Sequence, residues 1–124
     1  MSKKIAIVDD NERVVKQFKQ TAIEGRIISA HTFMDFKRNL LPQHAQVCVW
    51  LLDRKMPLDE GEVDIDLGDD LVESLKKVCP QTPRICISTK AYDPGDRAKM
   101  RDMYQGFANK FEPEEIIRII APFL

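Results

Sequence analysis

Four apolar runs of the sequence end in charged or hydroxyl side chains. The runs, with the residues that follow each of them, are Ile5–Val8 with Asp9 and Asp10, Val47–Leu52 with Asp53, Arg84–Ile87 with Ser88 and Thr89, and Phe107–Asn109 with Lys110. Carboxylates that meet at one place repel one another unless a proton or a cation neutralises them. A ligand set made only of oxygen atoms suits Mg²⁺ better than zinc. If the runs end side by side, the sequence predicts a Mg²⁺ site there.

The same residues have the parts needed for phosphoryl transfer. Asp53 would attack phosphorus in line and become an acyl phosphate, while the cation and the ammonium of Lys110 offset charge on the phosphoryl oxygens. Each residue alone is a weak signal, because an Asp after a strand is commonly the cap of the next helix. The order and spacing of all these residues at the ends of the apolar runs favour phosphoryl transfer over helix capping.

The elements that would position these residues alternate between strand-like and helical patterns. The apolar runs, with a weaker run at Arg26–Ala30, are continuous, which indicates strands buried on both faces of a parallel sheet. Between them, apolar residues recur at helical spacing. The expected helices run from Asn11 to Gly25, from Phe33 to a stop at Pro42, over Leu71–Val78, from Pro94 to Gly106, and onward from Pro113. This alternation predicts an α/β fold, a doubly wound five-stranded parallel sheet with five helices.

Composition and charge describe an ordinary globular domain. The chain has 124 residues, 44% of them hydrophobic and 31% charged, which fits a single domain. A net charge of -1 gives no overall field for nucleic acid or an anionic membrane. No apolar stretch approaches the roughly 18 residues of a membrane span, and the N-terminus lacks a signal-peptide pattern. We therefore expect a cytoplasmic protein whose cysteines stay reduced and bind no zinc.

Across essentially the whole chain, these motifs resemble the receiver domain of bacterial two-component response regulators. The matching segments are Ile5–Asp10 with the acidic pair, Val49–Pro57 with the Asp-x-x-Met-Pro signature, Ile85–Thr89 with the switch hydroxyl, and Gly106–Lys110 with the switch aromatic residue and the lysine. The resemblance implies a flavodoxin-like receiver fold and a single receiver domain over residues 1–124.

The resemblance also implies a role for each residue of the predicted site. Asp53 would accept the phosphoryl group from a sensor histidine kinase or a phosphotransfer protein, and Ser88 and Lys110 would contact the phosphoryl oxygens. The Mg²⁺ ligands would be Asp9, Asp10, Asp53 and the backbone carbonyl of Lys55. Such a domain catalyses its own phosphorylation and dephosphorylation but is not a conventional turnover enzyme.

Receivers of this kind switch a protein-interaction surface. Ser88, or Thr89 if the alignment is off by one residue, would move toward the phosphoryl group and leave space for Phe107 to turn inward. The surface of the fourth helix, fifth strand and fifth helix would then shift and bind a downstream protein target or a second copy of the chain. The isoleucines within Ile116–Ile120 form either that surface or part of the core. Direct contact with nucleic acid or membrane is not expected.

The sequence departs from the family pattern at three places. The segment Leu58–Leu67 is longer than usual and acidic, and we expect a solvated loop there, with a partner-recognition loop or a lid over the site as alternatives. Phe111 follows Lys110 where the family has proline, so a trans peptide bond is expected because a non-proline cis bond costs about 3 kcal/mol. Lys55 and Lys90 flank the phosphorylation site, where they either shield the phosphoryl oxygens or point into solvent.

Two other functions fit parts of the sequence. A Mg²⁺-dependent phosphohydrolase also uses an Asp nucleophile at a strand end, but it needs a second Asp two residues later, where this chain has Lys55. A degenerate receiver would keep the fold and act only as an unphosphorylated interaction module, and the complete set of motif residues argues against it. His31 and His44 lie outside the strand ends, so we expect them on loops or at the surface, and we expect Trp50 to pack within its strand.

Overall fold

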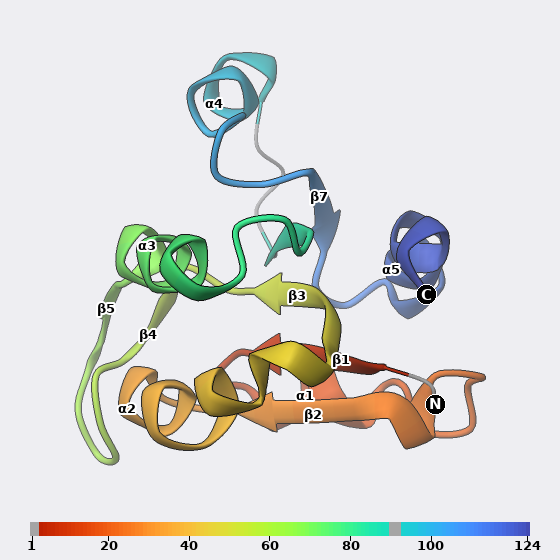
Figure 1. Cartoon of the computed structure of the whole chain (residues 1–124), viewed down its shortest axis with the longest axis horizontal. Coiled ribbons are helices and arrows are strands. Elements are labelled where there is room, and N and C mark those ends of the chain that lie inside the picture. The colour runs from red at the N-terminus through yellow and green to blue at the C-terminus, as the bar shows by residue number, and fades with distance from the viewer. Residues whose placement is uncertain (1–2, 90–92) are drawn as a thin grey trace.

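The main sheet of the protein contains five parallel strands. The computed structural model describes residues 3–89 and 93–124. The strands are β1 (Lys4–Val8), β2 (Ile27–Ala30), β3 (Val47–Leu52), β6 (Arg84–Ser88) and β7 (Gly106–Asn109). They lie in the order β2-β1-β3-β6-β7, and every pairing is parallel (Figure 1). The residues that follow these parallel strands therefore lie at the same edge of the sheet. The predicted fold class is confirmed.

Within residues 3–89 and 93–124, five α-helices accompany these strands. They are α1 (Glu12–Lys16), α2 (Phe33–Asp35), α3 (Gly68–Val78), α4 (Pro94–Lys99) and α5 (Pro113–Ile120). Short 3₁₀ or π turns are η1 (Glu24–Arg26), η2 (Phe36–Leu40), η3 (Leu41–Gln46) and η4 (Ala121–Phe123). In the part of the chain that the structure describes, no helix combines the length and the apolar character that crossing a bilayer requires.

The hydrophobic core is divided by the sheet into two clusters. Neighbouring residues of a strand point to opposite faces, so Trp50 packs with residues of α3 and η2 while Leu51 packs with residues of α1 and α5. Figure 1 shows α3 and α5 on opposite sides of the sheet. Trp50 is fully buried, as predicted, and so are Ile116 and Ile120 of the last helix. These two isoleucines therefore belong to the core and not to an exposed partner face.

The first helix is much shorter than predicted. Asn11 caps its start as expected, because the Asn11 side chain accepts a backbone hydrogen bond from the first turn. The helix ends at Lys16 and does not reach Gly25, because the next N–H groups bond three residues back and form turns, as from Lys19 to the Lys16 carbonyl at 3.1 Å. Gln20 then has a left-handed φ of 66°. The N–H of Gln20 donates to the Glu24 side chain at 3.0 Å, so this backbone group is satisfied without a helical partner.

The second and fourth helical segments also differ from prediction. Pro42 does not stop the second segment, because the chain passes from α2 through η2 into η3, where Pro42 lies in the first turn. Proline is tolerated there because its missing N–H would have had no helical partner. The fourth helix ends at Lys99 and does not continue toward Gly106. By Gln105 the chain has already joined the sheet, since the Gln105 N–H donates to the Arg84 carbonyl at 2.7 Å.

The acidic segment after β3 forms a β-hairpin, and the prediction of a solvated loop is wrong for its backbone. β4 (Lys55–Pro57) pairs antiparallel with β5 (Asp64–Asp66) as a separate two-stranded sheet (Figure 1). Gly61 lies in the connection with a φ of 78°, a conformation that glycine adopts without steric cost. The side chain of Met56 is fully buried and anchors β4 to the core, whereas all residues of β5 are exposed.

We predict that α3 contributes to stability mainly through its buried face. Leu71→Ala removes a side chain that is 0% exposed, and it should lower the free energy of unfolding by about 2–5 kcal/mol. Val78→Ala on the same helix, where Val78 is 43% exposed, should change it by only about 0.5 kcal/mol. Urea denaturation followed by circular dichroism measures both values. Equal losses for the two variants would contradict this placement of the helix.

Candidate functional site

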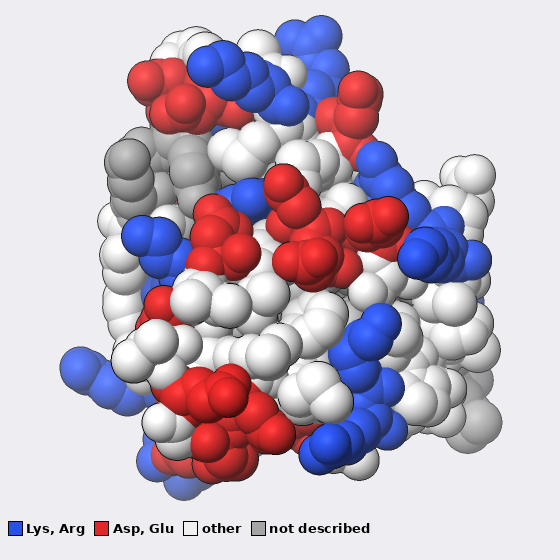
Figure 2. All heavy atoms as spheres, turned by 90° about the vertical axis from the view of Figure 1, so that its left-hand side faces the viewer, with Lys and Arg blue, Asp and Glu red and all other residues white. Residues whose placement is uncertain are grey.

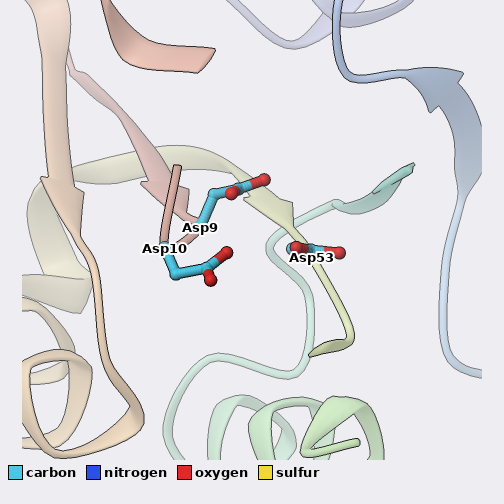
Figure 3. Close-up of side chains that lie close together, drawn as sticks. All are labelled: Asp9, Asp10 and Asp53. Atoms are coloured by element: carbon cyan, nitrogen blue, oxygen red, sulfur yellow. The ribbon is translucent and has the colours of Figure 1, made fainter. Parts of the chain in front are cut away.

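Three carboxylates gather at the carboxyl edge of the sheet. Asp9 and Asp10 follow β1 and Asp53 follows the neighbouring strand β3. One oxygen of each carboxylate lies within 4.8 Å of the others (Figure 3). The backbone positions them, because the Asp53 N–H donates to the Val8 carbonyl at 3.0 Å. The structure thus brings together the three acidic residues of the predicted cation site.

Lys110 joins this cluster from the end of β7. Its Nζ lies 2.8 Å from Oδ2 of Asp53 and 2.9 Å from Oδ2 of Asp9, and all three residues are buried. Burial and the charge of Asp53 raise the pKa of Asp9 to about 6. Burial alone would lower the pKa of Lys110, but hydrogen bonds with Asp53 and Asp9 outweigh it and raise that pKa. The ammonium is therefore held in its charged form between two carboxylates.

The donor set of the cluster fits a hard divalent cation. Three carboxylates face one ammonium, which leaves two negative charges in excess when all groups are ionised. Within the described ranges, this group of mutually close ligand atoms contains carboxylates and neither imidazole nor thiolate. Mg²⁺ prefers such oxygen ligands and keeps several of its water molecules in proteins. Asp9, Asp10 and Asp53 are therefore chemically suited to hold Mg²⁺, and Lys55 lies beside them at the start of β4.

A cavity of about 460 Å³ adjoins the cluster. Its lining residues are Asp10, Asp53, Arg54, Lys55, Asp64, Asp66, Ser88, Thr89 and Lys110. Ser88 and Thr89 both reach the same space as Asp53, so both remain candidates for the hydroxyl of the site. One liquid water takes about 30 Å³, so this space can hold a phosphoryl group together with a hydrated ion. Lys90, the predicted counterpart of Lys55, lies outside the described residues.

Phe107 lies in β7 and is not among the residues that line this cavity. Its ring packs edge-on against Tyr104 with the centroids 5.7 Å apart, and the guanidinium of Arg97 lies 5.6 Å from the Phe107 centroid. Tyr104 is buried, whereas Arg97 is exposed on α4. The predicted switch residue therefore connects the core with the α4 surface.

The replacement of proline by Phe111 does not keep Lys110 from the site. The described residues contain no cis peptide bond, so the bond between Lys110 and Phe111 is trans, as predicted. The Lys110 N–H donates to the Ser88 carbonyl at 3.0 Å, and the Lys110 carbonyl accepts a hydrogen bond from the Gln17 side chain. These contacts hold the turn after β7 against β6 and the end of α1.

No sequence motif predicts the role of Arg54. Its guanidinium donates to the Tyr104 hydroxyl at 2.9 Å and to Asp69 at 2.8 Å, and it forms an ion pair with Asp66 at 3.3 Å. A Cβ at Gly68 would lie only 2.4 Å from Cζ of Arg54, so the glycine leaves the space that the guanidinium fills. Arg54 therefore ties β5, α3 and the segment before β7 together, through partners that are distant along the chain.

Two further residues lie beside the site without a signal in the sequence. Nδ1 of His31 lies 3.1 Å from the backbone carbonyl of Asp9, and because a carbonyl can only accept, the imidazole donates. His31 directly follows β2 and is half-buried, so the expectation that it lies away from the strand ends is wrong. On β5, partial desolvation of its carboxyl group and the neighbouring carboxyl of Asp10 raise the pKa of Asp64. The hairpin therefore brings the Asp64 carboxyl within electrostatic range of Asp10.

We predict that Gly68→Ala acts through Arg54. In the otherwise wild-type protein, the Cβ of the new alanine should displace the Arg54 guanidinium and lower the free energy of unfolding by about 1 kcal/mol. The cost is small because the partners of the guanidinium, Asp66 and Asp69, are largely exposed. In an Arg54→Ala background the clash is absent, and alanine should be neutral or stabilising because it favours helix. Urea denaturation of both single variants and the double variant measures this coupling. The same loss in both backgrounds would contradict the assignment.

Known proteins resemble this chain in structure and not in sequence. No protein-family model matches the sequence, and no curated protein sequence matches it. The chemotaxis response regulator CheY4 of Vibrio cholerae superposes with a TM-score of 0.74 at 19% identity, with 100% of each chain covered. The response regulator DrrB, an OmpR/PhoB homologue of Thermotoga maritima, gives 0.71 at 23% identity, with 99% of this chain and 52% of DrrB covered.

A third similar structure is the response regulator TrrA of Thermotoga maritima, determined in complex with Mg²⁺-BeF. It superposes with a TM-score of 0.71 at 18% identity, with 98% of this chain and 99% of TrrA covered. The chain therefore spans about half of DrrB but nearly all of CheY4 and TrrA. It has the fold of response-regulator receiver domains, as the sequence motifs predict.

Proposed function

We propose that residues 1–124 form a receiver domain of two-component signalling, which accepts a phosphoryl group on Asp53 from a histidine kinase or a phosphotransfer protein. The main support is the buried contact of 2.8 Å between Asp53 and Lys110, beside Asp9 and Asp10 and next to a cavity that Ser88 lines. The receiver fold and the Mg²⁺-BeF complex of the similar protein TrrA add to it. This function places the protein in the cytoplasm.

Asp53, Lys110 and Ser88 would each have a separate role in phosphoryl transfer. A carboxylate oxygen of Asp53 forms the bond to phosphorus while the bond between phosphorus and the donor's imidazole nitrogen breaks. The imidazole takes up a proton and leaves neutral, and Asp53 becomes an acyl phosphate. Lys110 lies close enough to offset the charge of the phosphoryl oxygens. Ser88 would donate its hydroxyl hydrogen to one of those oxygens.

Asp9, Asp10, Asp53 and the backbone carbonyl of Lys55 would hold Mg²⁺ in this site. When bound, the ion supplies positive charge against the phosphoryl oxygens and reduces the repulsion among the carboxylates. Burial and the charge of Asp53 raise the pKa of Asp9 to about 6, and a cation at this site would favour the ionised form of Asp9.

The output would be a change in the face made by α4, β7 and α5. When Ser88 is drawn toward the phosphoryl group, Phe107 gains space to turn inward from its packing against Tyr104 and Arg97. The phosphoryl group shifts the equilibrium only if it favours one of these two arrangements. A downstream protein target or a second copy of the chain would bind the rearranged face.

We predict that Asp53→Asn abolishes phosphorylation. The amide keeps the size of the side chain but lacks the nucleophilic carboxylate. Wild-type protein incubated with acetyl phosphate and Mg²⁺ should gain one phosphoryl group by intact-mass spectrometry, and chelation of Mg²⁺ should prevent it. Asp53→Asn should gain none.

Asp70→Asn is the matched control for this experiment, because Asp70 is an exposed residue of α3 that does not line the cavity. It should label like the wild type. Labelling of Asp53→Asn to the wild-type level would rule out Asp53 as the acceptor. A wild-type protein that stays unlabelled would favour the degenerate receiver instead.

A further inference from the structure

The β4–β5 hairpin brings an acidic residue to the site that the receiver motifs do not include. Asp64 begins β5 and lines the same cavity as Asp10 and Asp53. Asp66, the other acidic residue that β5 contributes to this cavity, is paired with Arg54 at 3.3 Å. Asp64 forms no ion pair with a cationic side chain within residues 3–89 and 93–124.

The backbone of the hairpin fixes Asp64 at this position. In the antiparallel register, Asp64 lies opposite Pro57. At one end of the hairpin, an N–H of α2 donates to the Leu58 carbonyl at 2.9 Å, and at the other the Leu67 N–H donates to the Arg54 carbonyl at 2.8 Å. Because both ends are hydrogen-bonded to the body of the domain, the backbone holds Asp64 at the wall of the cavity.

The proximity of Asp64 to Asp10 indicates a shortage of positive charge. Asp64 and Asp10 line the same cavity, together with Asp53 and Asp66, and carboxylates that share a small space repel one another unless a proton or a cation neutralises them. The nearby ammonium of Lys110 is already paired with Asp9 and Asp53. Figure 2 shows acidic side chains in several groups over the side of the molecule that carries the hairpin.

We propose that Asp64 is a fourth carboxylate of the divalent-cation site, supplied by the inserted hairpin. This inference rests on the proposed function, which places the ion among Asp9, Asp10 and Asp53. Asp64 lies outside that mutually close group, so it binds water molecules of the ion and not the ion itself. Mg²⁺ keeps several waters in proteins, and groups that orient its ligands strengthen its binding. The site therefore binds Mg²⁺ more tightly than its three inner carboxylates alone would.

Calorimetric titration of the full chain with MgCl₂ tests this inference without measuring phosphorylation. Asp64→Asn should weaken Mg²⁺ binding about tenfold, in the range found when groups around metal ligands are removed. Glu60→Gln is the matched control, since it removes the same charge from an exposed residue of the same hairpin that does not line the cavity. At about 0.15 M salt, where charges are screened beyond about 8 Å, it should change the affinity less than about twofold.

Asp10→Asn separates this inference from the proposed function. If Asp10→Asn abolishes Mg²⁺ binding while Asp64→Asn binds like the wild type, the inference is wrong and the proposed cation site stands. If neither variant weakens binding, both are wrong. Equal weakening by Asp64→Asn and Glu60→Gln would show a general charge effect and would also overturn the inference. Asp64→Ser serves as a second neutral variant, and circular dichroism verifies that each protein is folded.

Discussion

The structure depends on one buried charge cluster, in which the ammonium of Lys110 lies between the carboxylates of Asp53 and Asp9. A buried charge without a partner costs several kcal/mol, so these groups are stable only together. Their contact requires β1, β3 and β7 to end at the same edge of the sheet, and it requires the turn after β7 to return to β6. The hydrogen bond from the Lys110 N–H to the Ser88 carbonyl meets the second requirement.

The sequence predicts this part of the molecule well, because β1 and β3 are continuous apolar runs and Asp9, Asp10 and Asp53 come directly after them. The ends of the helices are predicted less well, since they depend on tertiary contacts such as the entry of Gln105 into the sheet. The hairpin is missed because its strands are short and β5 has no buried residue, so no alternation of buried and exposed residues marks it. Arg54 and Asp64 act through partners far along the chain, which periodicity does not reveal.

The hairpin changes how the site is connected to the rest of the domain. Through Arg54, β5 contacts α3 and the hydroxyl of Tyr104, and Tyr104 packs against the predicted switch residue Phe107. A continuous series of contacts therefore links the cavity wall to the face of α4 and β7. Asp64, which lines the cavity, lies on the same hairpin. A change in the charge of the site and a movement of this cavity wall would therefore both affect the hairpin.

If the carboxylates of this cluster lack positive charge, a divalent cation must stabilise the folded protein. The most direct measurement is the free energy of unfolding from urea denaturation, first with a chelator and then with MgCl₂ at constant ionic strength. A ligand that binds only the folded state raises this free energy by about 1.4 kcal/mol at ten times its dissociation constant. We predict an increase of at least this size at high Mg²⁺ concentration. An unchanged free energy of unfolding would contradict the charge balance on which the site is built.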